Sequence, residues 1–253
     1  MTLPSPCFNP VGRFLAAGVL TTPLLLSIDR ISAAVALVLS VPLMLYLGFG
    51  PRAWVRWGWP VLLAAALAGI SMSLYGQPAG EEYFSFLTAR VTSNSLRLGE
   101  AITLRVLAIG LPTIALLRSI DPTDLGDGLA QILRLPARFV LSAMAGVRLL
   151  GAFRRDWHTL GLARRARGLG DHGRIRRGAS QAFALLIFAL RRADTLSTAM
   201  EARGFRNAEQ RTWARPSQLG RADALLILAC LSIAVVALGV SVWSGEFRFL
   251  GVT

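Results

Sequence analysis

The chain has 253 residues, of which 54% are hydrophobic, and its mean hydropathy of +0.54 is too high for an ordinary soluble domain of this length. It nevertheless carries a formal net charge of +13, and all 27 of its basic residues are arginine. The absence of lysine excludes a standard P-loop nucleotide site and Schiff-base chemistry, because both require a lysine side chain.

The apolar residues are grouped into five candidate transmembrane helices, because a membrane span needs about 20 mostly apolar residues. These helices are expected at residues 14–28, 31–49, 57–74, 100–117 and 222–243. The first is short and runs almost directly into the second, which is typical of a membrane hairpin and not of a cleavable signal peptide. Three tryptophans at the start of the third helix suit a membrane interface: Trp54, Trp57 and Trp59.

The fourth candidate helix contains Arg105 and Pro112. A charge or a proline inside a membrane span is tolerated where neighbouring helices satisfy it. We therefore expect this helix to pack inside a bundle. The segment before it, residues 76–100, has room for a partial further span.

Residues 118–221 differ from the rest of the chain, because they hold 19 of the 27 arginines. They also contain apolar runs such as AFALLIFAL, and this mixture favours amphipathic helices that lie on a membrane surface or against other helices. The sequence thus predicts an all-α integral membrane protein with about five transmembrane helices, four of them in residues 1–117 and one in residues 222–253. Residues 118–221 form a cytoplasmic domain between them. The distribution of arginines among the loops places the N-terminus on the cytoplasmic side of the cell membrane and the C-terminus on the outer side.

Three helices are expected within the arginine-rich domain. Asp121 and Pro122 suit a helix start, and that helix should end near Leu135, before a proline. The second helix is expected over residues 136–167 and the third over residues 175–203. The third is amphipathic, with one stripe at three- or four-residue spacing: Phe183, Leu186, Leu190, Ala193, Ser197 and Met200.

The tripeptide Ala-Arg-Gly closes both long helices, once at residues 166–168 and again at residues 202–204. Taken singly, each copy is an ordinary helix end, because glycine caps helices and arginine complements the helix dipole there. The repetition favours a docking role. A guanidinium offers five donors in a rigid fork, and small neighbours allow a partner surface to come close. We expect the two helices to converge at their C-terminal ends.

Two stretches that contain these tripeptides resemble a known family: DPTDLGDGLAQILRLPARFVLSAMAGVRLLGAFRRDWHTLGLARRARGLG and LRRADTLSTAMEARGF. They are similar to the T component of energy-coupling factor (ECF) transporters, of the CbiQ/EcfT type. The resemblance covers residues 120–205 well and the remaining spans only in hydropathy. The family often has a proline in the second helix where this chain has Gly151.

The resemblance implies a membrane scaffold without catalytic residues, metal ligands or a cofactor of its own. Each of its two coupling helices ends in a small-Arg-small motif that docks on one of two ATP-binding-cassette ATPase subunits. The implied docking residues are Ala166, Arg167, Gly168, Ala202, Arg203 and Gly204, with Arg164, Arg165 and Glu201 as supporting residues. A second membrane protein, the S component, carries the cargo, which the sequence leaves open between cobalt, nickel, biotin and other vitamins.

An integral-membrane enzyme is one alternative, but catalysis needs convergent ionisable groups and the spans offer little beyond Arg105. His158 and His172 are too few for a metal cluster, and Cys7 and Cys230 are not spaced as a disulfide framework. The aspartates near residue 121 suit a helix start.

The sequence pI of 11.6 raises nucleic-acid binding as another alternative. The positive-inside rule already accounts for arginines that flank membrane spans, and anionic lipid headgroups are the nearer polyanion. A membrane scaffold with a basic, lipid-contacting cytoplasmic domain therefore stays open as a further alternative.

Overall fold

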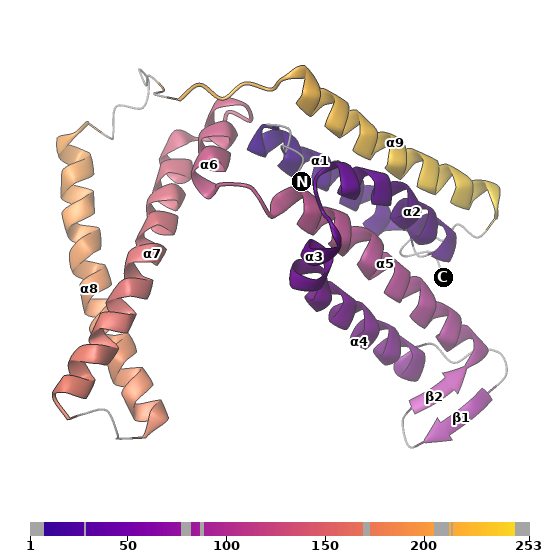
Figure 1. Ribbon diagram of the computed structural model, residues 1–253, viewed down its shortest axis with the longest axis horizontal. Helices are drawn as coiled ribbons and strands as arrows, with labels where there is room; N and C mark the ends of the chain where they lie inside the picture. Colours follow the sequence, from indigo (N-terminus) through magenta and orange to yellow (C-terminus); the bar gives the residue numbers. More distant parts are fainter. Residues whose placement is uncertain are drawn as a thin grey trace. The chain divides into compact units, whose positions relative to one another are not determined.

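The computed structural model describes residues 8–27, 29–76, 82–86, 89–168, 173–204, 213 and 215–245. The chain divides into two compact units, one from residues 1–120 and 218–253 and the other from residues 121–217 (Figure 1). The described residues are mainly helical, as predicted, and a short β-hairpin was not predicted.

The first unit contains most of the secondary structure. Its elements in chain order are α1 (Pro10–Leu26), α2 (Arg30–Tyr46), α3 (Pro51–Ala53), the π-helical turn η1 (Trp54–Gly58), α4 (Trp59–Tyr75), β1 (Glu82–Phe86), β2 (Ala89–Thr92), α5 (Ser93–Leu117) and α9 (Arg221–Trp243). The second unit consists of α6 (Pro122–Gln131), α7 (Ala137–Ala166) and α8 (Arg174–Ala202).

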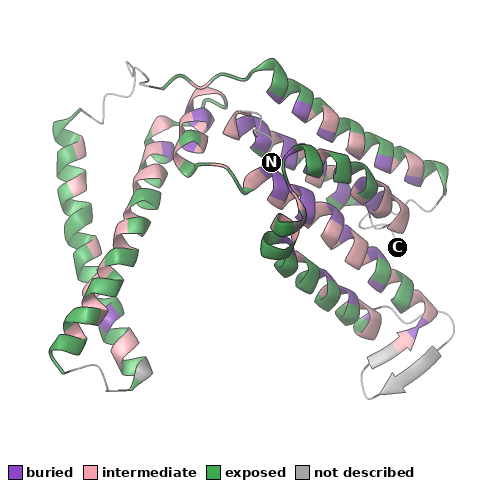
Figure 2. Cartoon of the chain, in the orientation of Figure 1, coloured by how far each residue is buried: buried purple, intermediate pink, exposed green. Residues whose placement is uncertain are grey.

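Helix α5 is the centre of the first unit, because α1, α2 and α4 all pack against it (Figures 1 and 2). Arg105 is 8% exposed and Pro112 is fully buried, which confirms that this helix packs inside a bundle. It begins at Ser93, seven residues earlier than predicted, where Thr92 and Ser95 form a capping box. The segment before it, which has room for a partial span, contains the antiparallel β1–β2 pair.

Helices α4 and α5 approach closely at two glycines. A Cβ atom at Gly69 would lie 2.0 Å from Oγ1 of Thr103, and one at Gly99 would lie 2.1 Å from Oγ of Ser73. Small residues let helix backbones approach in membranes, where van der Waals packing drives helix association. The main core cluster also relies on small residues, including Ala16, Ala33, Ala36, Ala108, Ala234 and Ala237.

Among the residues that the structure describes, three helical stretches are long and apolar enough to cross a membrane: Trp54–Tyr75, Ser93–Leu117 and Arg221–Trp243. Helices α1 and α2 are apolar but only 17 residues long. The structure therefore supports three of the expected spans, and the number five stays a prediction. The exposure of Trp57 and Trp59 at the start of α4 fits the interfacial position expected for them.

Buried polar side chains lie at the turn between α1 and α2, and one of them, Arg105, comes from α5. The guanidinium of Arg105 donates from Nη2 to Oγ of Ser27 at 3.2 Å, and the backbone N–H of Ser32 donates to Asp29 at 2.7 Å. Asp29 is 3% exposed at the same turn. The hydrogen bond from Arg105 to Ser27 thus joins the α1–α2 hairpin to the middle of α5.

In the second unit, α6 ends at Gln131, four residues before the predicted end. Arg134 adopts a positive φ of 52°, and Leu135 precedes a proline, which disfavours helical backbone. The other two helices match their predicted ranges within one residue at each end.

Candidate functional site: the two Ala-Arg-Gly helix ends

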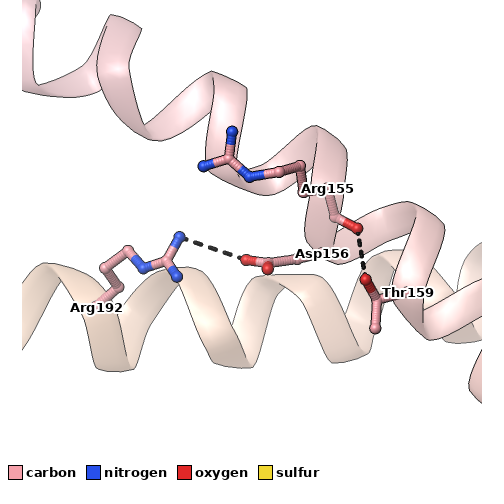
Figure 3. Close-up of polar contacts among 4 residues, drawn as sticks. All are labelled: Arg155, Asp156, Thr159 and Arg192. Atoms are coloured by element: carbon pink, nitrogen blue, oxygen red, sulfur yellow. Dashed lines mark hydrogen bonds and ion pairs between the residues drawn. The ribbon is translucent and has the colours of Figure 1, made fainter.

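Helices α7 and α8 cross as an antiparallel pair. Asp156 of α7 accepts from Nη1 of Arg192 of α8 at 3.3 Å, and Figure 3 shows this ion pair bridging the two helices. The side-chain amide of Gln181 donates to the carbonyl of Trp157 on the same crossing. Nearby, the hydroxyl of Thr159 donates to the carbonyl of Arg155 within α7 at 3.0 Å (Figure 3).

The first Ala-Arg-Gly motif forms the C-terminal end of α7. Ala166 is the last helical residue, and the N–H of Arg167 donates to the carbonyls of Ala163 at 3.3 Å and Arg164 at 3.2 Å. Gly168 adopts a φ of 72°, a left-handed conformation that favours glycine. Its N–H donates to the carbonyl of Arg165 at 3.0 Å. All three motif residues are exposed.

The second motif repeats this geometry at the end of α8. Arg203 has φ and ψ of −88° and 9°, against −89° and 8° for Arg167. Gly204 has a φ of 74°, and its N–H donates to the carbonyl of Glu201 at 3.0 Å. Ala202, Arg203 and Gly204 are also exposed. The chain therefore builds the same exposed helix end twice.

The two ends do not converge, contrary to the expectation from the sequence. Because α7 and α8 cross antiparallel, their C-terminal ends point in opposite directions along the crossed pair (Figure 1). The connection between the helices is short, and a short connection turns the chain back on itself. The site is therefore two separate tips and not one shared patch.

The three supporting residues have different surroundings. Arg164 donates from Nη2 to Oγ of Ser180 at 2.6 Å, so it ties α7 to α8. Arg165 lines a cavity on the crossing. Glu201 is exposed directly before the second tip, and its carbonyl accepts from the N–H of Gly204.

Sequence reasoning did not find the crossing contacts of Asp156, Gln181 and Arg192. Their signal is weak, because polar residues on an amphipathic helix are normally assigned to solvent. Two residues weighed in the sequence, Cys7 and His172, lie outside the described residues. Within the described part of the chain, no group of three or more His, Cys, Asp and Glu residues could hold a metal ion.

The apolar stripe of α8 is not covered by α7. Phe183, Leu186 and Leu190 are 65%, 53% and 58% exposed (Figure 2). Exposed apolar patches of this kind mark surfaces for protein partners or membranes. The stripe therefore leaves room for a partner along α8.

Comparison with known proteins gives one family match. A family model described as CbiQ, cobalt transport protein, matches residues 10–213. The chain is also similar to proteins named energy-coupling factor transporter transmembrane protein EcfT. The relative from Limosilactobacillus fermentum is 25% identical over 89% of this chain and 86% of its own length. That from Exiguobacterium sibiricum is 26% identical over 70% and 72%, and that from Acidaminococcus fermentans is 29% identical over 62% and 63%.

Proposed function

Because the chain belongs to the CbiQ/EcfT family of T components of energy-coupling factor transporters, we propose that it is the coupling subunit of such an importer. In this role it transmits movement from two cytoplasmic ATPase subunits to an S component that binds a vitamin or a transition-metal ion. The observation that carries the proposal is the pair of exposed helix ends with the same backbone geometry around Arg167 and Arg203.

Each tip suits insertion into a groove on one ATPase. The guanidinium can donate to two carboxylate or carbonyl oxygens at once, and the flanking alanine and glycine add almost no bulk. The left-handed glycine turns the chain away immediately after the arginine, so the arginine side chain lies at the helix end. A force applied to either tip is carried along a helix of about 30 residues.

The energy for transport has to come from partners, because the chain lacks lysine and therefore lacks the phosphate-binding lysine of a P-loop. ATP hydrolysis is thus assigned to the two ATPase subunits. The first unit, which contains the candidate membrane spans, and the exposed apolar stripe of α8 provide surfaces for the S component. Cargo recognition is assigned to the S component, so the cargo is not read from this chain.

Co-purification with ATPase subunits from the same cell tests the docking role. The Arg167→Ala, Arg203→Ala double variant should lose ATPase capture, and each single variant should weaken it. Loss of a desolvated charged contact costs about 2–5 kcal/mol. Arg→Lys at either position should restore capture only in part, because lysine lacks the planar fork.

The matched control is Arg155→Ala, Arg191→Ala, which removes the same charge from exposed positions of α7 and α8 away from their ends. This control should capture ATPases as the unchanged protein does. Equal capture by both double variants would contradict docking through the tips. Uptake that continues after ATP depletion would contradict the coupling role itself.

A further inference from the structure

A cavity of about 180 Å³ lies on the crossing of α7 and α8. Its walls come from both helices, with Trp157, His158, Leu162 and Arg165 on α7 and Arg177 and Gln181 on α8. The volume is more than ten times the roughly 10–15 Å³ that one buried water needs. The cavity therefore has room for a small molecule or a headgroup.

Contacts between the helices fix the walls of this cavity. Gln181 is 5% exposed, and its amide donates to the carbonyl of Trp157. The adjacent residue of α8, Ser180, accepts from Arg164 at 2.6 Å. Gly161 also lines the cavity, and a Cβ there would lie 3.5 Å from the Gln181 amide nitrogen. The cavity is thus part of the helix packing, and a glycine keeps its wall open.

Two arginines from different helices line the cavity. Arg165 and Arg177 bring two guanidinium groups from different helices, and the described residues that line it include no carboxylate. The nearest acidic residue along the described part of α7 is Asp156, which pairs with Arg192. Further arginines at positions 164, 167 and 176 add to the positive field at this end of the helix pair.

The size and lining favour an anion that carries carbon atoms. Two guanidinium groups can hold several oxygens of one phosphate group in a charge-assisted manner. The Trp157 ring and the Leu162 side chain provide an apolar wall beside them. Leu162 and Ile175 expose 52% and 89% of their surface, so apolar residues also surround this end of the pair. A phosphate ester offers oxygens to the two guanidinium groups and carbon atoms to the apolar wall.

We propose that this cavity binds a phosphate ester, with Arg165 and Arg177 holding the phosphate oxygens. The site is distinct from the docking contacts proposed for Arg167 and Arg203, so either can fail without the other. A phosphate ester can come from an anionic lipid headgroup or from a soluble metabolite. The experiment separates these two sources.

Binding is measured on the full-length protein in phosphatidylcholine nanodiscs. One arm adds phosphatidylglycerol to the bilayer and counts retained lipid by native mass spectrometry. A second arm titrates inorganic phosphate and glycerol 3-phosphate by calorimetry. Retention of phosphatidylglycerol alone identifies a lipid headgroup, and binding of the soluble phosphates identifies a free ester; both outcomes support the site.

Two variants test the residues. Arg165→Gln should weaken binding at least tenfold, whereas Arg176→Gln should leave it unchanged, because Arg176 carries the same charge but does not line the cavity. Gly161→Leu keeps every charge and fills the cavity, so it should abolish binding. It also serves as the test if Arg165→Gln alters the helix pair.

Two results would overturn the proposal. Equal losses in Arg165→Gln and Arg176→Gln would show attraction by net charge without a site. Absence of any bound phosphate ligand in both arms would show that the cavity is not a phosphate-ester site.

Discussion

At the scale of single residues, Arg105 and Asp29 are two buried charged side chains at the turn between α1 and α2 in the first unit. Both side chains are less than a tenth exposed. Charges removed from water need partners, and here the hydroxyl of Ser27 accepts from Arg105 while the N–H of Ser32 donates to Asp29. The bond from Arg105 to Ser27 joins a hairpin of two short helices to α5.

Arg105→Met should lower the free energy of unfolding by about 1.5–3 kcal/mol, because it removes the charged hydrogen bond to Ser27 and leaves the buried charge of Asp29 in place. The double variant Arg105→Met, Asp29→Asn should be more stable than Arg105→Met alone, since both charges are gone. Thermal unfolding in detergent measures the difference. If the double variant is the less stable of the two, the buried charge of Asp29 is not a cause of the destabilisation in Arg105→Met.

The control for this prediction is Arg30→Met. Arg30 pairs with Glu100 at 3.6 Å, but the two side chains are 35% and 69% exposed. An exposed ion pair contributes about 0–1 kcal/mol. This variant should therefore unfold close to the unchanged protein.

At the scale of helices, the close approach of α4 and α5 depends on glycine at defined positions. A Cβ at Gly99 would lie 2.8 Å from the backbone oxygen of Gly69 as well as close to Ser73. A side-chain hydroxyl can rotate away, but a backbone oxygen moves only with its helix. The two helices therefore cannot keep their separation once this glycine is replaced.

Gly99→Ala should destabilise the protein by about 1–3 kcal/mol, the usual cost of overpacking. Gly239→Ala in α9 is the matched control, because nothing lies within 4 Å of the added atom. Alanine favours helix over glycine by about 1 kcal/mol, so the control should be neutral or slightly stabilised. Thermal midpoints of the two variants should therefore shift in opposite directions, and parallel shifts would contradict the packing argument.

At the scale of the whole molecule, the sequence could predict the order of helices and both motif ends. The spacing of apolar residues, the helix-start signal at Asp121 and Pro122, and the glycine at each motif end are local signals. They therefore predict most of the bounds of α6, α7 and α8. The β1–β2 hairpin and the antiparallel separation of the two tips were missed. Both depend on how consecutive segments fold back on each other, and the propensity of each segment taken alone carries little of that information.

The orientation across the membrane remains a prediction from arginine asymmetry, with residues 118–221 inside and the C-terminal end outside. Single cysteines on a background without Cys7 and Cys230 test it. Ser244→Cys, at the end of α9, should react with a membrane-impermeant maleimide on intact cells. Thr195→Cys in α8 should react only after the cells are permeabilised. The reverse pattern would invert the topology.

The two helix ends share one backbone geometry but differ in charge. Arg164 and Arg165 precede the first tip, whereas Met200 and Glu201 precede the second. Including the motif arginines, the first tip carries three positive charges and the second carries one positive and one negative charge. Even two identical ATPase subunits would therefore occupy inequivalent positions on this chain. Since salt screens exposed charges, the contact at the α7 end would respond more strongly to ionic strength than the contact at the α8 end.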